Sequence, residues 1–481
     1  MKKYSSVSAQ QRAAFVLVAV SFYSFSIAFA QGNFQKAFGI EGFEKGSALK
    51  QLPDGGFIIG GETQSYGLQE TDMLLMRTDA GGNLQWSKTY GGPEREVIND
   101  VVLMNDNGFL FLAERYQPDK KEGEFLTLGK TDGSGKLLWK KIIDESGNET
   151  EGFSMNATSD GNYIITGITR KLNIVSTAFF NVTDRNPKLY LLKVDGNGNK
   201  IWSRCLLVSD AKISTTGNSV ITAKDGSYII TGNISRSEIS DAGKSADDAG
   251  NSDSRNMLLL KVNTDGSLAW ANEYGANRVT AGFRVIEKQD GGFVVVGIAT
   301  PDNTNNVDYF MTSIAADGAL QWSKTFGGAK FDAVSDVSQT TDGGFLVSGS
   351  TNSFGAGASD VLLFKTDAKG NVLWAKTYGS ESGEYGAQLS LTANGIALTG
   401  QVSMGKESYD VLLLKTDASG NAGCLGANAA VVGKNFSVTA KKITNASTTG
   451  IEPVNNPNYK KPDANNIGQQ GREVRAKNIC Q

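Results

Sequence analysis

The stretch "TDAGGNLQWSKTYGG", residues 78–92, recurs in altered form along the whole chain. Its Trp begins a column that holds all six Trp of the protein, spaced 52 to 68 residues apart: Trp86, Trp139, Trp202, Trp270, Trp322 and Trp374. A seventh copy, "TDASGNAGC", places Cys424 in the same column. Self-similarity at such a period predicts a repeat architecture, here with seven copies.

Two further columns predict a tight turn in every copy. Glycine stands four residues before the Trp column in all seven: Gly82, Gly135, Gly198, Gly266, Gly318, Gly370 and Gly420. Seven residues before it stand Asp79, Asp132, Asp195, Asn263, Ala315, Asp367 and Asp417. Because Gly accepts a positive φ and Asp caps its own turn, each copy is expected to form a strand, a tight turn and a second strand.

A second hairpin precedes each of these, marked by sequences such as "DGGF" at 54, 290 and 342 and "DNGF" at 106. The strand-like run that follows has a small residue in its fifth place: Gly61, Ala113, Gly167, Gly232, Gly297, Gly349 and Gly400. Gly inside a strand usually marks a close approach, and we expect the recurring Trp to lie over it. Four short strands per copy, repeated radially, predict the blades of a β-propeller.

The ends of the repeat region predict a closed ring. Residues 34–39 align with residues 86–91, the fourth strand of the first copy, but they precede that copy and belong to no complete repeat. The seventh copy lacks its fourth strand. The predicted fold is therefore all-β, a seven-bladed β-propeller of four-stranded blades over residues 31–424, closed by the N-terminal strand. Residues 425–481 form a tail predicted to pack weakly or to extend along the propeller.

Residues 1–30 have the features of a secretory signal peptide. A basic start is followed by an apolar run that ends in Ala28-Phe29-Ala30, a small-x-small cleavage pattern, so the mature chain is expected to begin near Gln31. The alternative is a retained membrane anchor, but the run is short, and we expect no transmembrane segment after cleavage. The protein is thus predicted to be secreted, in the periplasm, outside the cell or at its surface.

Charge and composition exclude several classes of function. Cleavage would remove three positive and no negative charges, taking the formal net charge from −3 to −6, which disfavours nucleic acid as a partner. The chain contains no His, which excludes Ser-His-Asp and Cys-His catalysis and His-ligated metals. No metal or cofactor is expected. In an oxidising compartment we expect a Cys424–Cys480 disulfide and a free Cys205.

The longest links between strands, in the third and fourth copies, are the predicted partner-binding face, because variable loops on a rigid scaffold usually hold ligands. An apolar cluster in the third-copy loop predicts a partner surface or, alternatively, a cap on a blade edge. The acidic fourth-copy loop would form its polar rim. A calcium site there is less favoured than a solvated loop. The predicted partner-binding residues are Phe179, Phe180, Asp184, Asp241, Asp247 and Asp248.

The innermost strands are expected to direct Asp100, Arg284 and Asp336 toward the central channel. Two carboxylates would suffice for glycosidase or lyase chemistry without His, although the interpretation we favour is that channel walls are polar because they are wet. A basic column lies within the strands and is interpreted as ion pairing between blades: Arg77, Lys130, Lys193, Lys261, Lys365 and Lys415.

The repeat "DGGF…KTDxxGNxxWxKTYGG" resembles the β-propeller repeats of secreted bacterial and archaeal surface proteins over nearly all of residues 33–424. Its Asp-x-x-Gly-x-x-x-Trp core is also similar to quinoprotein-type propellers, whose Trp motifs pin neighbouring blades and whose active members bind pyrroloquinoline quinone with calcium, a ligand set with no counterpart here. The predicted function is a secreted, non-enzymatic binding or scaffold module for a protein or glycan partner. The alternative is a carbohydrate-active or quinone-dependent enzyme.

Overall fold

The computed structural model describes residues 32–479 except for a set of short segments: 40–41, 65–69, 93, 117–123, 144, 146–147, 172–174, 178–179, 183–185, 209–212, 237–254, 277–278, 302–305, 406–407, 423–425, 451–467 and 471–473. Every regular element in the described residues is a β-strand, which confirms the predicted all-β class. Nowhere in these residues is there a helix long and apolar enough to cross a membrane.

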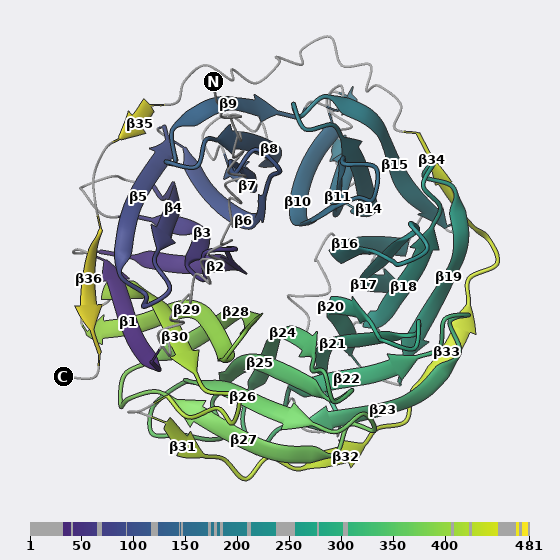
Figure 1. The fold of residues 1–481 in the computed structure, drawn as a ribbon. Coiled ribbons are helices and arrows are strands. Elements are labelled where there is room, and N and C mark those ends of the chain that lie inside the picture. The colour runs from purple at the N-terminus through teal and green to yellow at the C-terminus, as the bar shows by residue number, and fades with distance from the viewer. Residues whose placement is uncertain are drawn as a thin grey trace, which may run out of the picture. The chain divides into compact units, whose positions relative to one another are not determined.

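Antiparallel groups of four strands follow one another along the chain, and we number these groups as sheets 1 to 7 (Figure 1). Sheets 2 and 3 are joined by one parallel pairing, of Thr150 with Phe125. Sheet 1 runs outward through β2 (Glu44–Gln51), β3 (Phe57–Thr63), β4 (Asp72–Thr78) and β5 (Leu84–Gly91). Sheet 2 contains β6 (Arg95–Leu103), β7 (Phe109–Tyr116), β8 (Glu124–Thr131) and β9 (Leu137–Ile142). Sheet 3 contains β10 (Asn148–Ala157), β11 (Tyr163–Lys171), β14 (Lys188–Val194) and β15 (Lys200–Val208). A separate two-stranded pair is formed by β12 (Val175–Thr177) and β13 (Phe180–Val182).

The remaining sheets have the same order. Sheet 4 contains β16 (Ile213–Thr222), β17 (Tyr228–Arg236), β18 (Arg255–Val262) and β19 (Leu268–Gly275). Sheet 5 contains β20 (Thr280–Glu287), β21 (Phe293–Ala299), β22 (Asp308–Ile314) and β23 (Leu320–Phe326). Sheet 6 contains β24 (Asp332–Gln339), β25 (Phe345–Thr351), β26 (Asp360–Thr366) and β27 (Val372–Tyr378). Sheet 7 contains β28 (Glu384–Thr392), β29 (Gly395–Gly405), β30 (Ser408–Thr416) and, on its outside, the N-terminal β1 (Phe34–Gly39). The sheets surround a common centre, which gives a propeller-like fold.

The hydrophobic core lies between neighbouring sheets rather than in one central mass. Seven clusters occur among the described residues, and each combines side chains of two adjacent sheets. One of them packs Phe38 of β1 and Val411 of sheet 7 against Leu49 and Phe57 of sheet 1. The middle strands are therefore buried on both faces, and β3 is buried at every position.

The Trp and Gly columns meet between adjacent sheets. All seven turn glycines have a positive φ, from 71° to 87°. The Trp of one sheet packs on the turn Gly of the next, so that a Cβ on Gly135 would lie 2.8 Å from Trp86. Tyr90, four residues after that Trp, donates a hydrogen bond to the same glycine's carbonyl oxygen at 2.5 Å. The stretch at residues 78–92 thus forms its own turn, and its Trp86 and Tyr90 contact the corresponding turn of the next sheet.

This arrangement corrects the prediction that Trp lies over the small residue in the second strand of each copy. A Cβ on Gly61 would lie 1.8 Å from the carbonyl oxygen of Lys45 in β2, and Gly167 and Gly232 have equivalent contacts with β10 and β16. Each innermost strand bulges toward its neighbour at that point. The small residue therefore makes room for backbone, not for an indole ring.

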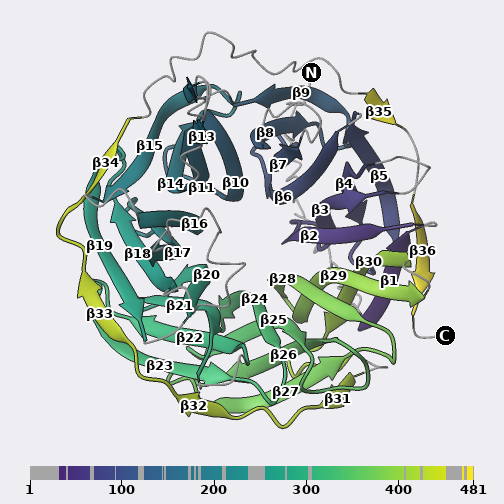
Figure 2. The same ribbon diagram turned by 180° about the vertical axis from the view of Figure 1, so that it is seen from behind.

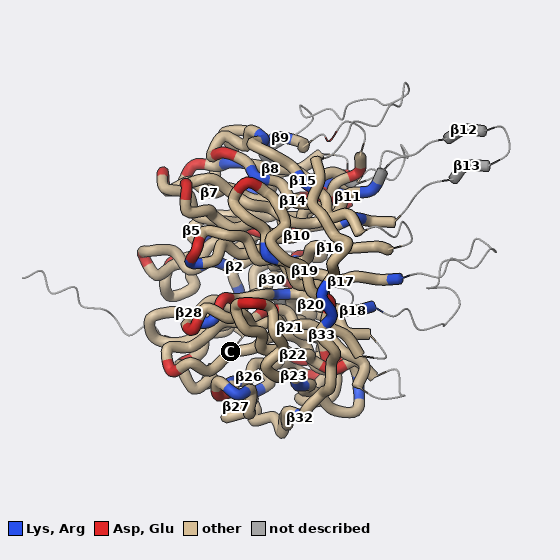
Figure 3. Tube along the Cα trace, turned by 90° about the vertical axis from the view of Figure 1, so that its right-hand side faces the viewer, with Lys and Arg blue, Asp and Glu red and all other residues tan. Residues whose placement is uncertain are grey.

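Five of the six residues of the basic column form ion pairs within their own sheet, so for these five the prediction of pairing between blades is wrong. The sixth, Lys415, is buried in sheet 7. The side chain of Arg77 in β4 lies 2.6 Å from Asp54, in the turn between β2 and β3 of the same sheet. The equivalent pairs are Lys130 with Asp106, Lys193 with Asp160, Lys261 with Asp225 and Lys365 with Asp342. In each pair the Asp also caps the turn that the basic side chain crosses. Figure 3, which views the molecule from the right-hand side of Figure 1, shows Lys and Arg interspersed with Asp and Glu.

The tail adds a fifth strand to the outer edge of six sheets. In chain order the added strands are β31 (Gly426–Asn428) on sheet 6, β32 (Gly433–Asn435) on sheet 5, β33 (Thr439–Lys442) on sheet 4, β34 (Ala446–Thr449) on sheet 3, β35 (Gly468–Gln470) on sheet 1 and β36 (Arg475–Asn478) on sheet 7. Figure 2 shows these short strands following the outside of the sheets in reverse order. Among the described residues, β9 of sheet 2 has no such outer partner.

Candidate functional site

A β-bulge interrupts the innermost strand of every sheet at the same place. The register shifts by one extra residue in sheets 1 to 6 and by two in sheet 7. A bulge of this kind re-aims a side chain out of the strand's regular alternation. The extra residues are Ser47, Asn99, Phe153, Asn218, Phe283, Ser335 and the pair Ala387 and Gln388.

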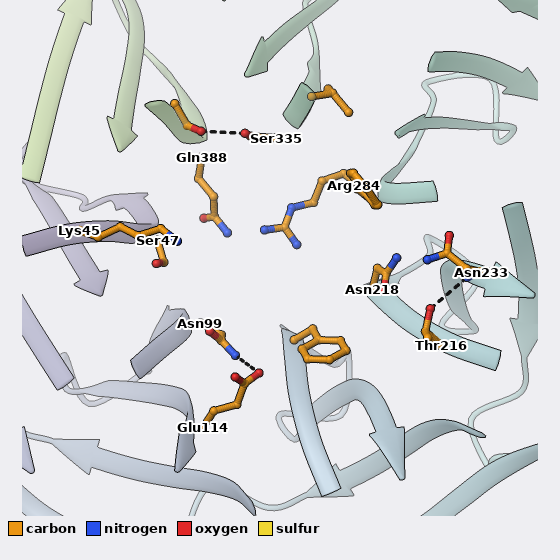
Figure 4. Close-up of a pocket in the computed structure, with 14 residues that line it drawn as sticks. Lys45, Ser47, Asn99, Glu114, Thr216, Asn218, Asn233, Arg284, Ser335 and Gln388 are labelled. Atoms are coloured by element: carbon orange, nitrogen blue, oxygen red, sulfur yellow. Dashed lines mark hydrogen bonds between the residues drawn. The ribbon is translucent and has the colours of Figure 1, made fainter. Parts of the chain in front are cut away.

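These bulges line an axial cavity of about 540 Å³. All seven innermost strands contribute to its wall, together with Glu114 of β7 and Asn233 of β17. Figure 4 shows side chains from opposite sheets directed into this common space. The lining consists of Lys45, Ser47, Asn99, Glu114, Phe153, Thr216, Asn218, Asn233, Phe283, Arg284, Val334, Ser335, Gly386 and Gln388.

Part of the lining is fixed by bonds to the neighbouring sheet. Asn99 donates to the carbonyl oxygen of Gly152 at 2.8 Å, and Asn218 and Ser335 donate in the same way to the glycines that precede the next bulge. Asn99 also donates to Glu114 at 2.5 Å. These side chains have their positions set by the scaffold, so this half of the wall is pre-organised.

The other part of the lining presents hydrogen-bond donors. In the described residues the ammonium group of Lys45 and the hydroxyl of Ser47 have no hydrogen-bond or ion-pair partner. Gln388 uses its carbonyl oxygen to accept from Leu49 at 3.1 Å, which leaves its NH₂ group to the cavity. The guanidinium of Arg284 points across the cavity toward Gln388 (Figure 4), and its Nε lies 3.9 Å from a carboxylate oxygen of Asp336.

The structure separates the three predicted channel residues. Arg284 lines the cavity, whereas Asp100 and Asp336 are not part of its wall. The carboxylate of Asp100 accepts hydrogen bonds from the backbone N–H of the next residue, Val101, at 2.9 Å and from that of Met155 in the next sheet at 3.0 Å. Asp336 makes the two equivalent bonds. Burial raises the pKa of Asp336, with Arg284 opposing that shift.

The same link recurs at other junctions and explains why those two positions carry Asp. Ser154 and Gln388 each accept from the backbone N–H of the next sheet. Ala48 and Arg284 occupy the corresponding position before sheets 2 and 6 and cannot accept such a bond. Asp100 and Asp336 therefore use their second carboxylate oxygen to accept from the N–H of the residue that follows each of them. Their carboxylates hold the junctions together, and this arrangement does not resemble a catalytic pair.

The long-loop prediction concerns residues that are mostly outside the described chain. Phe179, Asp184, Asp241, Asp247 and Asp248 all lie there. Phe180 begins β13, and its side chain is not described. A central channel was predicted, but apart from Arg284 its lining residues were not, because a bulge reverses the alternation from which side-chain direction is read. A signal was present, since Gly46, Gly152, Gly217, Gly282 and Gly386 directly precede the bulge in five sheets.

The structure describes one of the three cysteines, Cys205. Cys205 is a buried free thiol in β15, and burial raises its pKa, as expected for an unreactive thiol. Cys424 and Cys480 lie outside the described residues. Within the described ranges no group of three or more Asp, Glu, Cys or His is placed to hold a metal ion.

The chain matches no protein-family model, and no curated protein matches it. It is similar to several solved structures. An α-L-arabinanase from Penicillium chrysogenum is 11% identical, with 80% of this chain and 98% of that chain covered and a TM-score of 0.43. An ulvan lyase is 8% identical, with coverages of 80% and 96% and a TM-score of 0.48. A Dyadobacter fermentans protein described as of unknown function is 11% identical, with coverages of 68% and 99% and a TM-score of 0.43. At these values none of them indicates what this chain binds.

Proposed function

We propose that the protein is an exported, seven-bladed β-propeller, closed by β1, that binds a carbohydrate in its axial cavity. The seven sheets would be the blades, with β1 as the outer strand of the seventh. The pairing of β1 with β30 and the packing of Phe34 on Gly82 of sheet 1 support this closure. Export rests on the signal-peptide features of residues 1–30, and its test is cleavage near Gln31 in secreted material.

The chemistry of the cavity wall carries the proposal of a carbohydrate ligand. Amide and hydroxyl groups converge there from several sheets, and Phe153 and Phe283 add partly exposed aromatic rings. A few fixed polar groups beside apolar surface are typical of a small-molecule site, and this combination matches the alternating hydroxyls and C–H faces of a sugar. The volume of about 540 Å³ is within the usual range for ligand pockets, roughly 300–1,000 Å³.

A glycan array followed by calorimetry with the best ligand tests this proposal. Phe153→Ala should abolish or strongly weaken binding, because Phe153 lines the cavity and belongs to none of the seven core clusters. Phe331→Ala is the matched control, since Phe331 is 50% exposed and is not part of the cavity wall. No binding on the array, or equal loss in both variants, would reject the axial cavity as a carbohydrate site.

A carbohydrate-active enzyme is the second candidate, and the array should also be scored for cleavage products. Glycosidases generally use two carboxyl groups at the scissile bond. Glu114 is the one carboxylate among the described lining residues, and Asn99 holds it at 2.5 Å. Binding without turnover is therefore the favoured result. Turnover that is lost in Glu114→Gln would establish the enzyme instead.

A further inference from the structure

We infer that the axial cavity selects an acidic saccharide, whose carboxylate lies between Lys45, Ser47, Gln388 and Arg284. The inference rests on the proposed function and narrows it to one class of ligand. Lys45 and Ser47 belong to β2, Gln388 to the adjacent β28, and Arg284 to β20 on another side of the cavity. Figure 4 shows Arg284 and Gln388 directed toward one another, with Ser47 and Lys45 beside Gln388.

The four groups have one property in common, which is that each presents hydrogen-bond donors. The ammonium of Lys45, the hydroxyl of Ser47 and the NH₂ of Gln388 have no acceptor among the described residues. Arg284 faces Asp336 through Nε at 3.9 Å, a distance longer than a hydrogen bond. A surplus of donors that face one another across part of a partly buried cavity is complementary to a carboxylate, which accepts at two oxygens.

The nearby acidic groups compensate the charge of Arg284 but not that of Lys45. Asp336 accepts from backbone N–H groups at the junction between sheets, and its carboxylate, 3.9 Å from Nε of Arg284, is the ion-pair partner of that guanidinium. Asp100 is engaged with backbone N–H groups in the same way. Lys50, on the same strand as Lys45, lies 3.7 Å from Asp100 and compensates that charge. Glu114 belongs to sheet 2 and is bonded by Asn99. Lys45 therefore remains as a positive charge for which the described residues provide no counter-ion.

The two parts of the cavity wall differ in charge. Sheets 2 to 4 contribute Asn99, Phe153, Thr216 and Asn218, which are neutral and suit the hydroxyl and C–H faces of a sugar, and Glu114, whose carboxylate accepts a hydrogen bond from Asn99 at 2.5 Å. The donor cluster lies on sheets 1, 5 and 7. A uronic-acid residue would satisfy both parts at once, with its ring against Phe153 and the neutral polar groups and its carboxylate against the donors. A neutral sugar would leave the ammonium of Lys45 unsatisfied, which costs free energy in a partly buried site.

Calorimetry with trigalacturonate and with its methyl ester tests the inference, because the two differ in charge and hardly in shape. The acid should bind at least about tenfold more tightly than the ester, as expected for charge-assisted bonds in a half-buried site. Added salt should weaken binding of the acid more than binding of the ester. Lys45→Met should bring the two affinities together, whereas Lys45→Arg should preserve most of the difference. Lys369→Met, on an exposed turn of sheet 6, is the control and should change neither.

Each other outcome has a distinct meaning. Equal affinity for the acid and the ester, or an unchanged preference in Lys45→Met, overturns the inference and leaves a carbohydrate site in place. Inorganic sulfate that competes as well as the acid saccharide would show an anion site with no saccharide selectivity, which also overturns it. If the array identifies another saccharide while neither trimer binds, the inference fails alone. If no saccharide binds at all, the proposed function fails with it.

Discussion

Deleting residues 31–39 should destabilise the whole of the described fold, because β1 contacts two sheets at once. It pairs with β30 in sheet 7 over five residues, from Phe34 opposite Lys415 to Phe38 opposite Val411. It also reaches sheet 1, where Phe34 packs on Gly82 and Lys36 donates to Asn83 at 2.7 Å. Sheet 7 without β1 would expose the edge of β30 and one face of its core.

The size of the effect follows from what is buried. Phe38 is completely buried, and replacing a buried Phe by Ala costs about 3–5 kcal/mol. The hydrogen bonds to β30 add a net contribution of about 1 kcal/mol each. A natural protein has a stability of only about 5–15 kcal/mol, so the deletion should remove most of it. Phe38→Ala alone should cost about 4 kcal/mol.

Urea unfolding, monitored by Trp fluorescence, measures both changes, since all six Trp lie in sheets 1 to 6 and report on the sheets other than sheet 7. Phe331→Ala is the control for loss of an exposed Phe and should shift the midpoint little. If the deletion protein unfolds at the same temperature and urea concentration as the intact chain, the proposed role of β1 in closing a ring is refuted. Loss of sheet 7 alone, with the Trp signal unchanged, would show that the proposed closure does not stabilise the other sheets.

Three further predictions test other parts of the chain. Tyr378→Phe should lower stability by about 1–2 kcal/mol, measured by urea unfolding, because it removes the 2.5 Å bond to the buried carbonyl of Gly420. Burial and the charge of Glu96 raise the pKa of Asp72 to about 6, so its ionisation disfavours the folded state as the pH rises through that value. Asp72→Asn should therefore melt higher than the wild type at pH 8, and the advantage should vanish near pH 4. Cys424 and Cys480 remain predicted to form a disulfide, and a mapped bridge to Cys205 would contradict this.

The turns of this fold could be predicted from sequence because their requirements are local. A turn Gly must accept a positive φ and an Asp must reach its own backbone, and both needs are met within a few residues. Asp79 accepts from Gly81 and Asn83 at 2.9 and 2.8 Å, as the column predicts. The partners of Trp86 and Arg77 could not be predicted in this way. Which surface an indole or a guanidinium meets depends on the angle between neighbouring strands and sheets, and the repeat pattern does not specify that angle.

The tail shows a different limit. Its added strands are only three or four residues long. β31 and β33 are exposed at every position, and the alternation of half-buried and exposed residues in β34 covers only four residues, too few for a strand to be recognised from sequence. They form because each outermost strand of a sheet offers unpaired backbone groups, and any extended segment passing alongside can bond to them. The sheets thus determine the structure of the tail more than the tail sequence does.

The seven copies within one chain also separate structural from functional positions. The turn Gly is present in all seven copies, and its contacts with the preceding sheet explain why. The bulged position, by contrast, carries Ser47, Asn99, Phe153 or other residues, although the backbone bulge itself is common to every sheet. Where the backbone is constant and the side chain varies, the fold does not determine which residue is present. Half of the residues that line the axial cavity occupy these bulged positions, so its chemistry can change while the contacts of the turn glycines between neighbouring sheets keep the fold.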